Sequence, residues 1–295
     1  MSLRAATILQ PGVSGRVLAS FSRVCDLVTD DGAVVALVWG GVGNGPLNVV
    51  LDDEPGVDLP TGARFVVNEH GQVTGTSGSA SHLRVDLSAA ATWDARPDWA
   101  YLRARWERIA AGAKIIARIL TERGITLTSC GLPQTDCDAL SRYPFRNPQS
   151  AIRNLIGLGP GLTPAGDDWL AGWLLALWTA PPAPSPGAET SPPAPSPARR
   201  GEANSPLPWQ GGGEGGGRSV AEIILATAAR TTILSRAFLA CAAAGEADES
   251  WHDLLNALAS ESANQRISES TRVILAHGAT SGAAMLMGFV AGIDV

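Results

Sequence analysis

The sequence predicts an α+β protein in which a β-rich, barrel- or sandwich-like N-terminal part is followed by a mostly α-helical part. Short valine-rich runs separated by turn signals fill the chain up to Leu87. From Pro97 onward, apolar residues recur at three- and four-residue steps, and residues 180–219 follow neither pattern. We therefore expect a β-rich domain over residues 1–95 and a helical domain over residues 96–295, interrupted by a disordered insert.

Six runs of strand length alternate with turns in the N-terminal part. The turns carry paired polar residues and glycine, as in Asp30-Asp31-Gly32 and Glu69-His70-Gly71. Regular short strands with such turns are typical of an antiparallel barrel or sandwich. The runs are residues 16–21, 33–39, 47–51, 63–67, 72–76 and 83–87.

The loop over residues 40–46 is richer in glycine than a hairpin requires. One interpretation is a wide turn. The other is a loop whose backbone approaches a ligand, because only glycine permits such close approach, and this makes Asn44 a candidate ligand contact.

Several helices are predicted after Pro97. One amphipathic helix runs from Trp99 to a glycine stop after Arg123. A short helix over residues 151–156 leads into a glycine-rich loop, and another over residues 221–244 is expected to break near Thr231. Ser250 and Ser268 are expected to cap two further helices, and a last helix opens after Thr280.

Residues 180–219 hold half of the 20 prolines of the chain and a Gly-Gly-Gly-Glu-Gly-Gly-Gly run. Such a segment buries too little apolar area to offset its ordering entropy, so we expect disorder. A long insertion between two packed helices is tolerated because the cost of loop closure rises only logarithmically with length.

Composition narrows the class of protein. The chain has 295 residues, 17% charged and 45% hydrophobic, with a net charge of −6, which argues against nucleic acid as a partner. Residues 273–293 are long enough to span a membrane, but their polar residues and glycines favour a buried helix instead. The start of the chain lacks a signal-peptide pattern. The four cysteines, without metal-ligand spacing, indicate reduced thiols and a cytoplasmic location; they are Cys25, Cys130, Cys137 and Cys241.

The most informative stretch is Gly157–Gly172, where a glycine run stops at Thr163-Pro164 and an apolar helical pattern begins. We expect Thr163 to be the N-cap and Pro164 the first helical residue. Because the helix is apolar on every side, it should be buried, with its free amides and Asp167-Asp168 close to the interior. The run is neither a P-loop nor a dinucleotide fingerprint, since the required lysine and glycine order are absent.

These features predict an anion site with an added need for a cation. Backbone amides from Gly161 to Gly166 would hold a carboxylate or phosphate at the helix start. We expect Asp167 and Asp168 to be ionised there and therefore unsuited to act as general acids. A second anion would then repel them unless Mg²⁺ or an arginine intervenes. The arginines available for this are Arg153, Arg230 and Arg236, and a purely structural alternative pairs them with the two aspartates.

An internal echo follows near the C-terminus. The run from Gly166 to Gly172 aligns without a gap with the run from Gly282 to Gly288, with a threonine-containing loop before each. Either two helix starts face one ligand, or small residues simply permit close helix packing. The ligand interpretation adds Thr280, Ser281 and Gly282 to the candidate site. Among the histidines, His277 is the candidate for a ligand contact.

The stretch Leu155–Gly172 resembles the hallmark of the AllH family, which contains a subunit of oxamate carbamoyltransferase. Weaker similarity lies at residues 43–48, 231–235 and 278–282, so the resemblance covers nearly the whole chain outside the insert. It implies carbamoyl transfer between oxamate or oxalurate and carbamoyl phosphate, carried out with partner subunits. In similar sequences an acidic residue is expected where this chain has Ala284, which predicts a weaker second half-site.

The sequence thus predicts a carbamoyltransferase subunit acting on small anionic metabolites. In this hypothesis Asp167 and Asp168 bind a metal, tentatively Mg²⁺, or an amide group. The anion contacts would come from amides and polar side chains of the loops, namely Gly159, Gly161, Thr163, Gly166, Arg153, Asn44, Thr280, Ser281 and Gly282. Alternatives are a non-catalytic regulatory or scaffold subunit that binds an anion, and a metal-dependent hydrolase or phosphotransferase.

Overall fold

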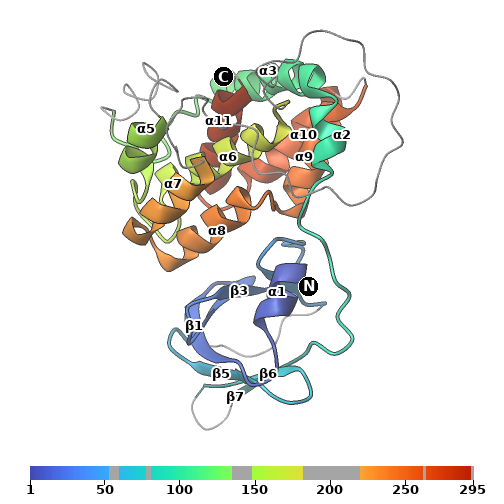
Figure 1. Cartoon of the computed structure of the whole chain (residues 1–295), viewed down its shortest axis with the longest axis vertical. Coiled ribbons are helices and arrows are strands. Elements are labelled where there is room, and N and C mark those ends of the chain that lie inside the picture. The colour runs from blue at the N-terminus through green and yellow to red at the C-terminus, as the bar shows by residue number, and fades with distance from the viewer. Residues whose placement is uncertain (53–59, 78–80, 135–147, 182–219, 262–263, 294–295) are drawn as a thin grey trace, which may run out of the picture.

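A computed structural model describes residues 1–52, 60–77, 81–134, 148–181, 220–261 and 264–293. It confirms the α+β class: a curled sheet forms the N-terminal part, and a body of helices lies over it (Figure 1). Cys137 and nearly all of the predicted insert, residues 182–219, lie outside the described residues.

The described part of the sheet has seven strands in the order β4-β3-β2-β1-β5-β6-β7. Neighbouring strands are antiparallel except β3 and β4, and β1 has a register shift between Val17 and Ala19. The sheet curls into a half-barrel around its own core of alternating aliphatic side chains, which includes Leu27, Leu37 and Val73. The strands are β1 (Ser14–Ser20), β2 (Val24–Thr29), β3 (Val34–Val38), β4 (Asn48–Val50), β5 (Arg64–Val67), β6 (Gln72–Ser77) and β7 (Ser81–Asp86).

Two elements of this part were not predicted. Strand β2 is buried along most of its length because Leu27 faces the sheet core while Val28 faces helix α8 (Ile233–Ala243). A strand buried on both faces lacks the apolar–polar alternation that marks a half-buried strand. Helix α1 (Leu3–Ile8) has a single fully buried residue, Ala5, and therefore shows no helical period.

The helical part contains three groups of helices in chain order. Before the glycine loop lie α2 (Trp99–Arg103), α3 (Trp106–Glu122) and α5 (Pro148–Leu155). Helix α6 (Ala165–Thr179) follows the loop, then α7 (Val220–Thr227), the 3₁₀ turn η1 (Ala228–Arg230) and α8. The chain closes with α9 (Glu249–Ala259), α10 (Asn264–Leu275) and α11 (Ser281–Ile293).

Several predicted helix boundaries were wrong. The helix expected from Trp99 to Arg123 is interrupted at Arg105, because α2 is held to the loop before α9 by Trp99 Nε1, which donates to the Gly245 carbonyl at 2.9 Å. The cap of α9 is Asp248 rather than Ser250. Helix α10 begins at Asn264, upstream of the predicted cap Ser268. The predicted break near Thr231 is confirmed by η1.

Helices α6 and α11 form the centre of the helical part. Nearly every residue of α6 is buried, as predicted for a helix that is apolar on all sides. Glycines bring the two backbones into contact: a Cβ on Gly172 would lie 1.9 Å from the Met285 carbonyl oxygen. A Cβ on Gly288 would lie 1.9 Å from the carbonyl oxygen of Trp169.

The two helices run parallel, with their N-termini together. Further along α11, Gly292 lies against Ala176 of α6, so the contacts advance in the same direction on both helices. At the other end, the hydroxyls of Thr163 and Ser281, which precede and begin the two helices, are 3.0 Å apart. The start of α6 therefore lies beside the start of α11.

No described helix is long and apolar enough to cross a membrane. The candidate span over residues 273–293 is divided between the end of α10 and the 13 residues of α11, with a turn between them.

Gly172→Ala is expected to destabilise the protein by roughly 1–3 kcal/mol, because the added methyl overlaps a backbone oxygen in a packed core. The matched variant Gly288→Ala should lose a similar amount, since it makes the reciprocal contact. Denaturant unfolding measures both. Gly41→Ala, at a positive φ of 79° with open space around it, reports backbone strain alone. Unchanged stability in both helix variants would contradict the close packing.

Candidate functional site

The glycine loop between α5 and α6 is shaped by three residues with positive φ. Gly157, Gly159 and Gly161 have φ values of 76°, 114° and 96°, a region that other residues rarely adopt. The loop turns back on itself so that the Gly166 N–H donates to the Leu158 carbonyl at 2.9 Å. A Cβ on Gly166 would lie 2.1 Å from the Leu155 carbonyl oxygen, so this position also requires glycine.

Thr163 was predicted to cap α6, and this prediction was wrong. The cap is Pro164, with extended backbone angles, and the helix begins at Ala165. The extended Pro164 displaces Thr163 by one position from the helix start, and its hydroxyl lies beside Ser281 of α11 instead. The residue therefore links two helix starts rather than closing one.

A third helix start joins this cluster. Thr232 caps α8 by accepting from the Ser235 N–H at 3.1 Å, and its hydroxyl donates to the Leu162 carbonyl of the glycine loop. The neighbouring Thr231 hydroxyl donates to Asp167 Oδ2. We refer to these residues together as the helix-start cluster, formed by Thr163, Asp167, Asp168, Thr231, Thr232 and Ser281.

Thr231 and Thr232 were not predicted as site residues, although they lie in a stretch with weak similarity to the family. The available signal was a threonine pair directly before an apolar helical run, which is a capping pattern. What it could not show is that the second hydroxyl would reach a loop far away in the sequence.

Asp167 has a structural role in the cluster. Its Oδ1 accepts from the Gly157 N–H at 2.9 Å, and its Oδ2 accepts from the Thr231 hydroxyl. With 2% of its surface exposed, it ties the glycine loop to the segment before α8. Both oxygens are engaged with the protein itself.

Asp168 differs from its neighbour in having an unused oxygen. Its side chain is 7% exposed, and Oδ2 is buried with no hydrogen-bond partner among the described residues. The pKa of Asp168 is raised from 3.8 to about 7, mainly by burial, with the charge of Asp167 acting in the same direction and the hydroxyls of Ser281 and Thr163 acting against it. The expectation that this carboxyl is firmly ionised was therefore wrong, because desolvation outweighs the favourable helix ends.

The available amides are fewer at α6 than predicted. The N–H of Gly166 is used by Leu158, and those of Asp167 and Asp168 both donate to the Pro164 carbonyl. By contrast, the N–H groups of Gly161 and Thr163 have no acceptor in the described part of the chain. In the first turn of α11, the N–H groups of Ser281 and Ala283 are likewise without an acceptor there, whereas Gly282 donates to His277.

The arginine side chains predicted to neutralise Asp167 and Asp168 do not contact the carboxylates of these residues in the described structure. Arg230 Nη1 donates to the Arg153 carbonyl at 2.8 Å, and the ion pairs of the described residues join other groups. No ion pair between these described arginines, Arg236 included, and Asp167 or Asp168 is present. Within the described ranges, no three His, Cys, Asp or Glu side chains are grouped as metal ligands. The metal assignment to Asp167 and Asp168 thus stays a prediction.

Asn44 lies at a different contact. Its backbone N–H and side-chain amide both donate to Glu249 Oε2, at 3.0 and 3.1 Å, and its carbonyl accepts from the Glu249 N–H. A second link nearby is the ion pair between Arg4 and Glu246 at 2.6 Å. The glycine-rich loop after β3 therefore fastens the sheet to the start of α9, and no hydrogen bond or ion pair between described residues joins Asn44 to the helix-start cluster.

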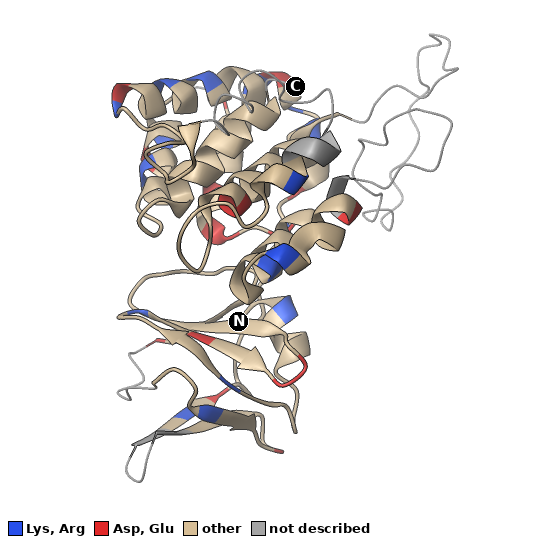
Figure 2. Cartoon of the chain, turned by 90° about the vertical axis from the view of Figure 1, so that its left-hand side faces the viewer, with Lys and Arg blue, Asp and Glu red and all other residues tan. Residues whose placement is uncertain are grey.

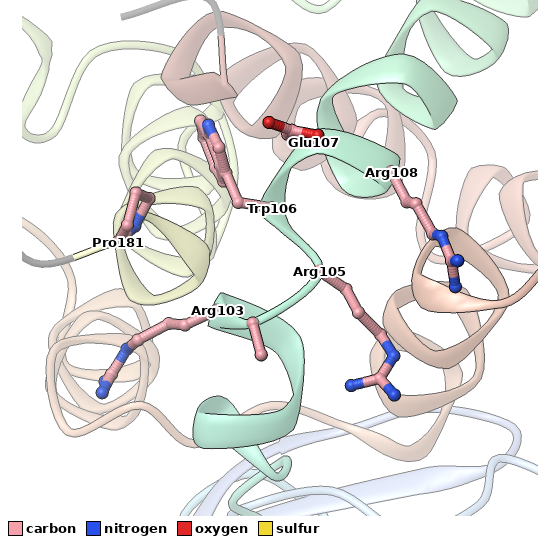
Figure 3. A pocket seen from close by; sticks show the side chains of 7 residues that line it. Arg103, Arg105, Trp106, Glu107, Arg108 and Pro181 are labelled. Carbon is pink, nitrogen blue, oxygen red and sulfur yellow. The ribbon is translucent and has the colours of Figure 1, made fainter. Parts of the chain in front are cut away.

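A cavity of about 700 Å³ is lined by none of the predicted site residues. It lies at the break between α2 and α3, and Figure 3 shows its arginines pointing in different directions. Each arginine is engaged elsewhere: Arg103 donates to the Trp178 carbonyl, Arg105 stacks on Tyr101, and Arg108 pairs with Glu261. The cavity therefore presents no convergent cationic group for an anion.

Figure 2 shows basic and acidic residues interspersed over both parts of the molecule. The net charge of the whole chain is −6.

The pH dependence of stability tests the burial of Asp168. Its folded pKa of about 7 lies above the ordinary 3.8, so the folded state holds a proton that the unfolded chain releases. This contribution is complete below about pH 4 and is lost as the pH rises to about 7, on the order of a few kcal/mol. In denaturation curves across this range, Asp168→Asn should flatten the decline.

Asp26 provides the matched control, because burial raises its pKa to about 6 on β2, away from the cluster. The effect of Asp26→Asn should end near pH 6, one unit earlier. A wild-type stability that does not decline between pH 4 and 7 would contradict the burial of both carboxyls.

Comparison with known proteins shows similarity to one family over part of the chain. The family model of oxamate carbamoyltransferase subunit AllH matches residues 155–196 and 211–293. No curated protein and no solved structure matches the chain. The match begins at the last residue of α5 and extends through α11, so it includes the whole helix-start cluster. The resemblance carried by the glycine motif is confirmed over these residues, which make up less than half of the chain. The similarity expected at residues 43–48 lies outside the match.

Proposed function

We propose that this chain is a subunit of an oxamate carbamoyltransferase-like complex and that the helix-start cluster binds its small anionic substrate. The reaction transfers a carbamoyl group from carbamoyl phosphate to oxamate, which gives oxalurate and phosphate, or runs in reverse with phosphate as the acceptor. The observation that carries the proposal is the buried, partnerless Oδ2 of Asp168, placed among the hydroxyls where two parallel helices begin.

The chemistry of the cluster suits such substrates. A carbamoyl or primary amide group offers N–H donors, which a carboxylate oxygen accepts. The carboxylate or phosphate of the same substrate requires hydrogen-bond donors. The backbone N–H groups of Gly161, Thr163 and Ser281 can supply them, because they have no acceptor in the described structure. Oriented donors in a partly dry site also stabilise charge that develops during acyl or carbamoyl transfer.

We also propose that the chain acts together with partner subunits and is located in the cytoplasm. The helix-start cluster has one carboxylate oxygen without a hydrogen-bond partner among the described residues and a set of donors. We assign to partner subunits the further groups that catalysis needs. The free thiols of Cys25 and Cys241 agree with a reducing compartment.

The same incompleteness supports a second candidate, a regulatory or scaffold subunit that binds an anionic metabolite without performing chemistry. A metal-dependent hydrolase or phosphotransferase is a third, supported only by the adjacent aspartates. The structural engagement of both Asp167 oxygens weakens that third candidate.

Activity measurements distinguish these candidates. Phosphorolysis of oxalurate is measured with the purified chain alone and after mixing with its partner subunits. We expect activity only in the mixture, and turnover by the chain alone would favour a self-sufficient enzyme. A mixture that is active without this chain, and is only modulated when the chain is added, would favour the regulatory subunit.

Asp168→Asn is expected to lower substrate binding in calorimetric titration at least tenfold while leaving stability at pH 7 unchanged or raised, because a buried charge is removed. Asp167→Asn is the matched control. It should cost roughly 1–3 kcal/mol of unfolding free energy by weakening two hydrogen bonds to a carboxylate. Reversed results, with Asp168→Asn unstable and its binding intact, would assign Asp168 to structure instead.

A further inference from the structure

The starts of α6 and α11 are equivalent in backbone and packing. Gly166 aligns with Gly282 and Gly172 with Gly288, and the contacts of the two helices are reciprocal. Gly172 lies on the carbonyl of Met285, and Gly288 lies on the carbonyl of Trp169, the residue that aligns with Met285. The pair therefore has an approximate internal two-fold relation.

The side chains break this relation in the first turn, where Asp167 and Asp168 align with Ala283 and Ala284. Asp167 is engaged with the protein itself, so the second of these positions is the one that bears on a ligand. Asp168 of α6 aligns with Ala284 of α11, and both are buried where the helices begin. Ala284 belongs to the same apolar cluster as Ala165 and Trp169 of α6. One helix start therefore ends in a carboxylate, and its counterpart has only a methyl group.

The two helix starts also differ in the hydrogen-bonding groups that they leave unsatisfied. On the α6 side, the amides of Asp167 and Asp168 are used internally, and the unused groups of the described structure are the N–H groups of Gly161, Thr163 and Ala165 together with one acceptor, Asp168 Oδ2. On the α11 side, the unused groups in the described structure are donors, the N–H groups of Ser281 and Ala283. The positive end of the α11 dipole is not offset by an acidic residue in its first turn.

We propose that the cluster orients its ligand by this inequality, with an N–H of the ligand on Asp168 and an anionic oxygen at the start of α11. The chemical class is a small molecule in which a primary amide or carbamoyl N–H lies a few bonds from a carboxylate or phosphate. This inference rests on the proposed function and deepens it, because it assigns the two ends of the substrate to the two helices. Thr163 and Ser281 are only partly buried, so the cluster is approachable from solvent.

The first test compares oxamate with pyruvate, in which a methyl group replaces the amide nitrogen. Calorimetric titration of the full chain, assembled with its partners, should give roughly tenfold to hundredfold tighter binding for oxamate, because a hydrogen bond to a carboxylate is lost with pyruvate. Asp168→Ala should reduce this preference to less than about threefold, mainly by weakening oxamate. Asp168→Asn should give an intermediate preference.

The second test restores the acidic residue on α11. Ala284→Asp should weaken both oxamate and pyruvate by roughly tenfold or more, because a carboxylate then occupies the end that receives the anion. Ala284→Asn adds a similar volume without charge and should weaken both probes by less than about threefold. Thermal unfolding of each variant separates loss of binding from loss of fold.

The results separate this inference from the proposed function. If the complex turns over oxalurate but Asp168→Ala keeps the preference for oxamate, the orientation is wrong and the function stands. If a chelator abolishes binding of both probes equally, and Asp168→Ala does the same, Asp168 holds a cation and the orientation is again overturned. If the complex shows no carbamoyl transfer while the preference depends on Asp168, the proposed reaction fails and the recognition of an amide beside an anion remains.

Discussion

The contact between the backbones of α6 and α11 determines the rest of the helical part. Helices normally pack at 8–10 Å because side chains separate them. Here Gly172 and Gly288 remove those side chains, and each lies on a carbonyl of the other helix. Because the helices are parallel, this closeness extends to their first turns, where Thr163 meets Ser281. The glycines that the sequence repeats thus have a packing role, and the packing places two helix starts side by side.

This arrangement explains why Asp168 behaves differently from an ordinary carboxylate at a helix start. The first-turn position favours the charged form, but the second helix and the apolar side chains around it remove the water that an exposed carboxylate would have. Burial then prevails and raises the pKa of Asp168 to about 7. Asp167, one residue earlier, faces the glycine loop and satisfies both oxygens with Gly157 and Thr231. The two adjacent residues therefore have different roles: Asp167 fastens the glycine loop, and Asp168 keeps a carboxylate oxygen without a hydrogen-bond partner in the described structure.

The sequence was sufficient for features that depend on local pattern. The α+β class, the buried α6 and the break near Thr231 all follow from period, turn residues and glycine. It failed where distant segments decide the outcome. Strand β2 was missed because α8 covers the face that would otherwise be polar, and the cap of α6 was misplaced because Thr163 contacts α11. The ionisation of Asp168 could not be predicted, since burial by a helix more than a hundred residues later is invisible in a linear motif.

The loop at Asn44 shows how a glycine pattern is ambiguous until the fold is known. Its glycines do permit close approach, but the group approached is Glu249 of α9 rather than a ligand. Gly159 and Gly161 have the same backbone freedom, yet their loop lies against three helix starts and leaves amides unused. The two loops differ in their surroundings. The donors of the Asn44 loop are satisfied by the carboxylate of Glu249. The Gly159–Gly161 loop lies beside Asp168 Oδ2, which has no hydrogen-bond partner among the described residues. An unsatisfied buried acceptor is costly to keep unless something binds it, and this is the physical reason to place the substrate at the helix-start cluster.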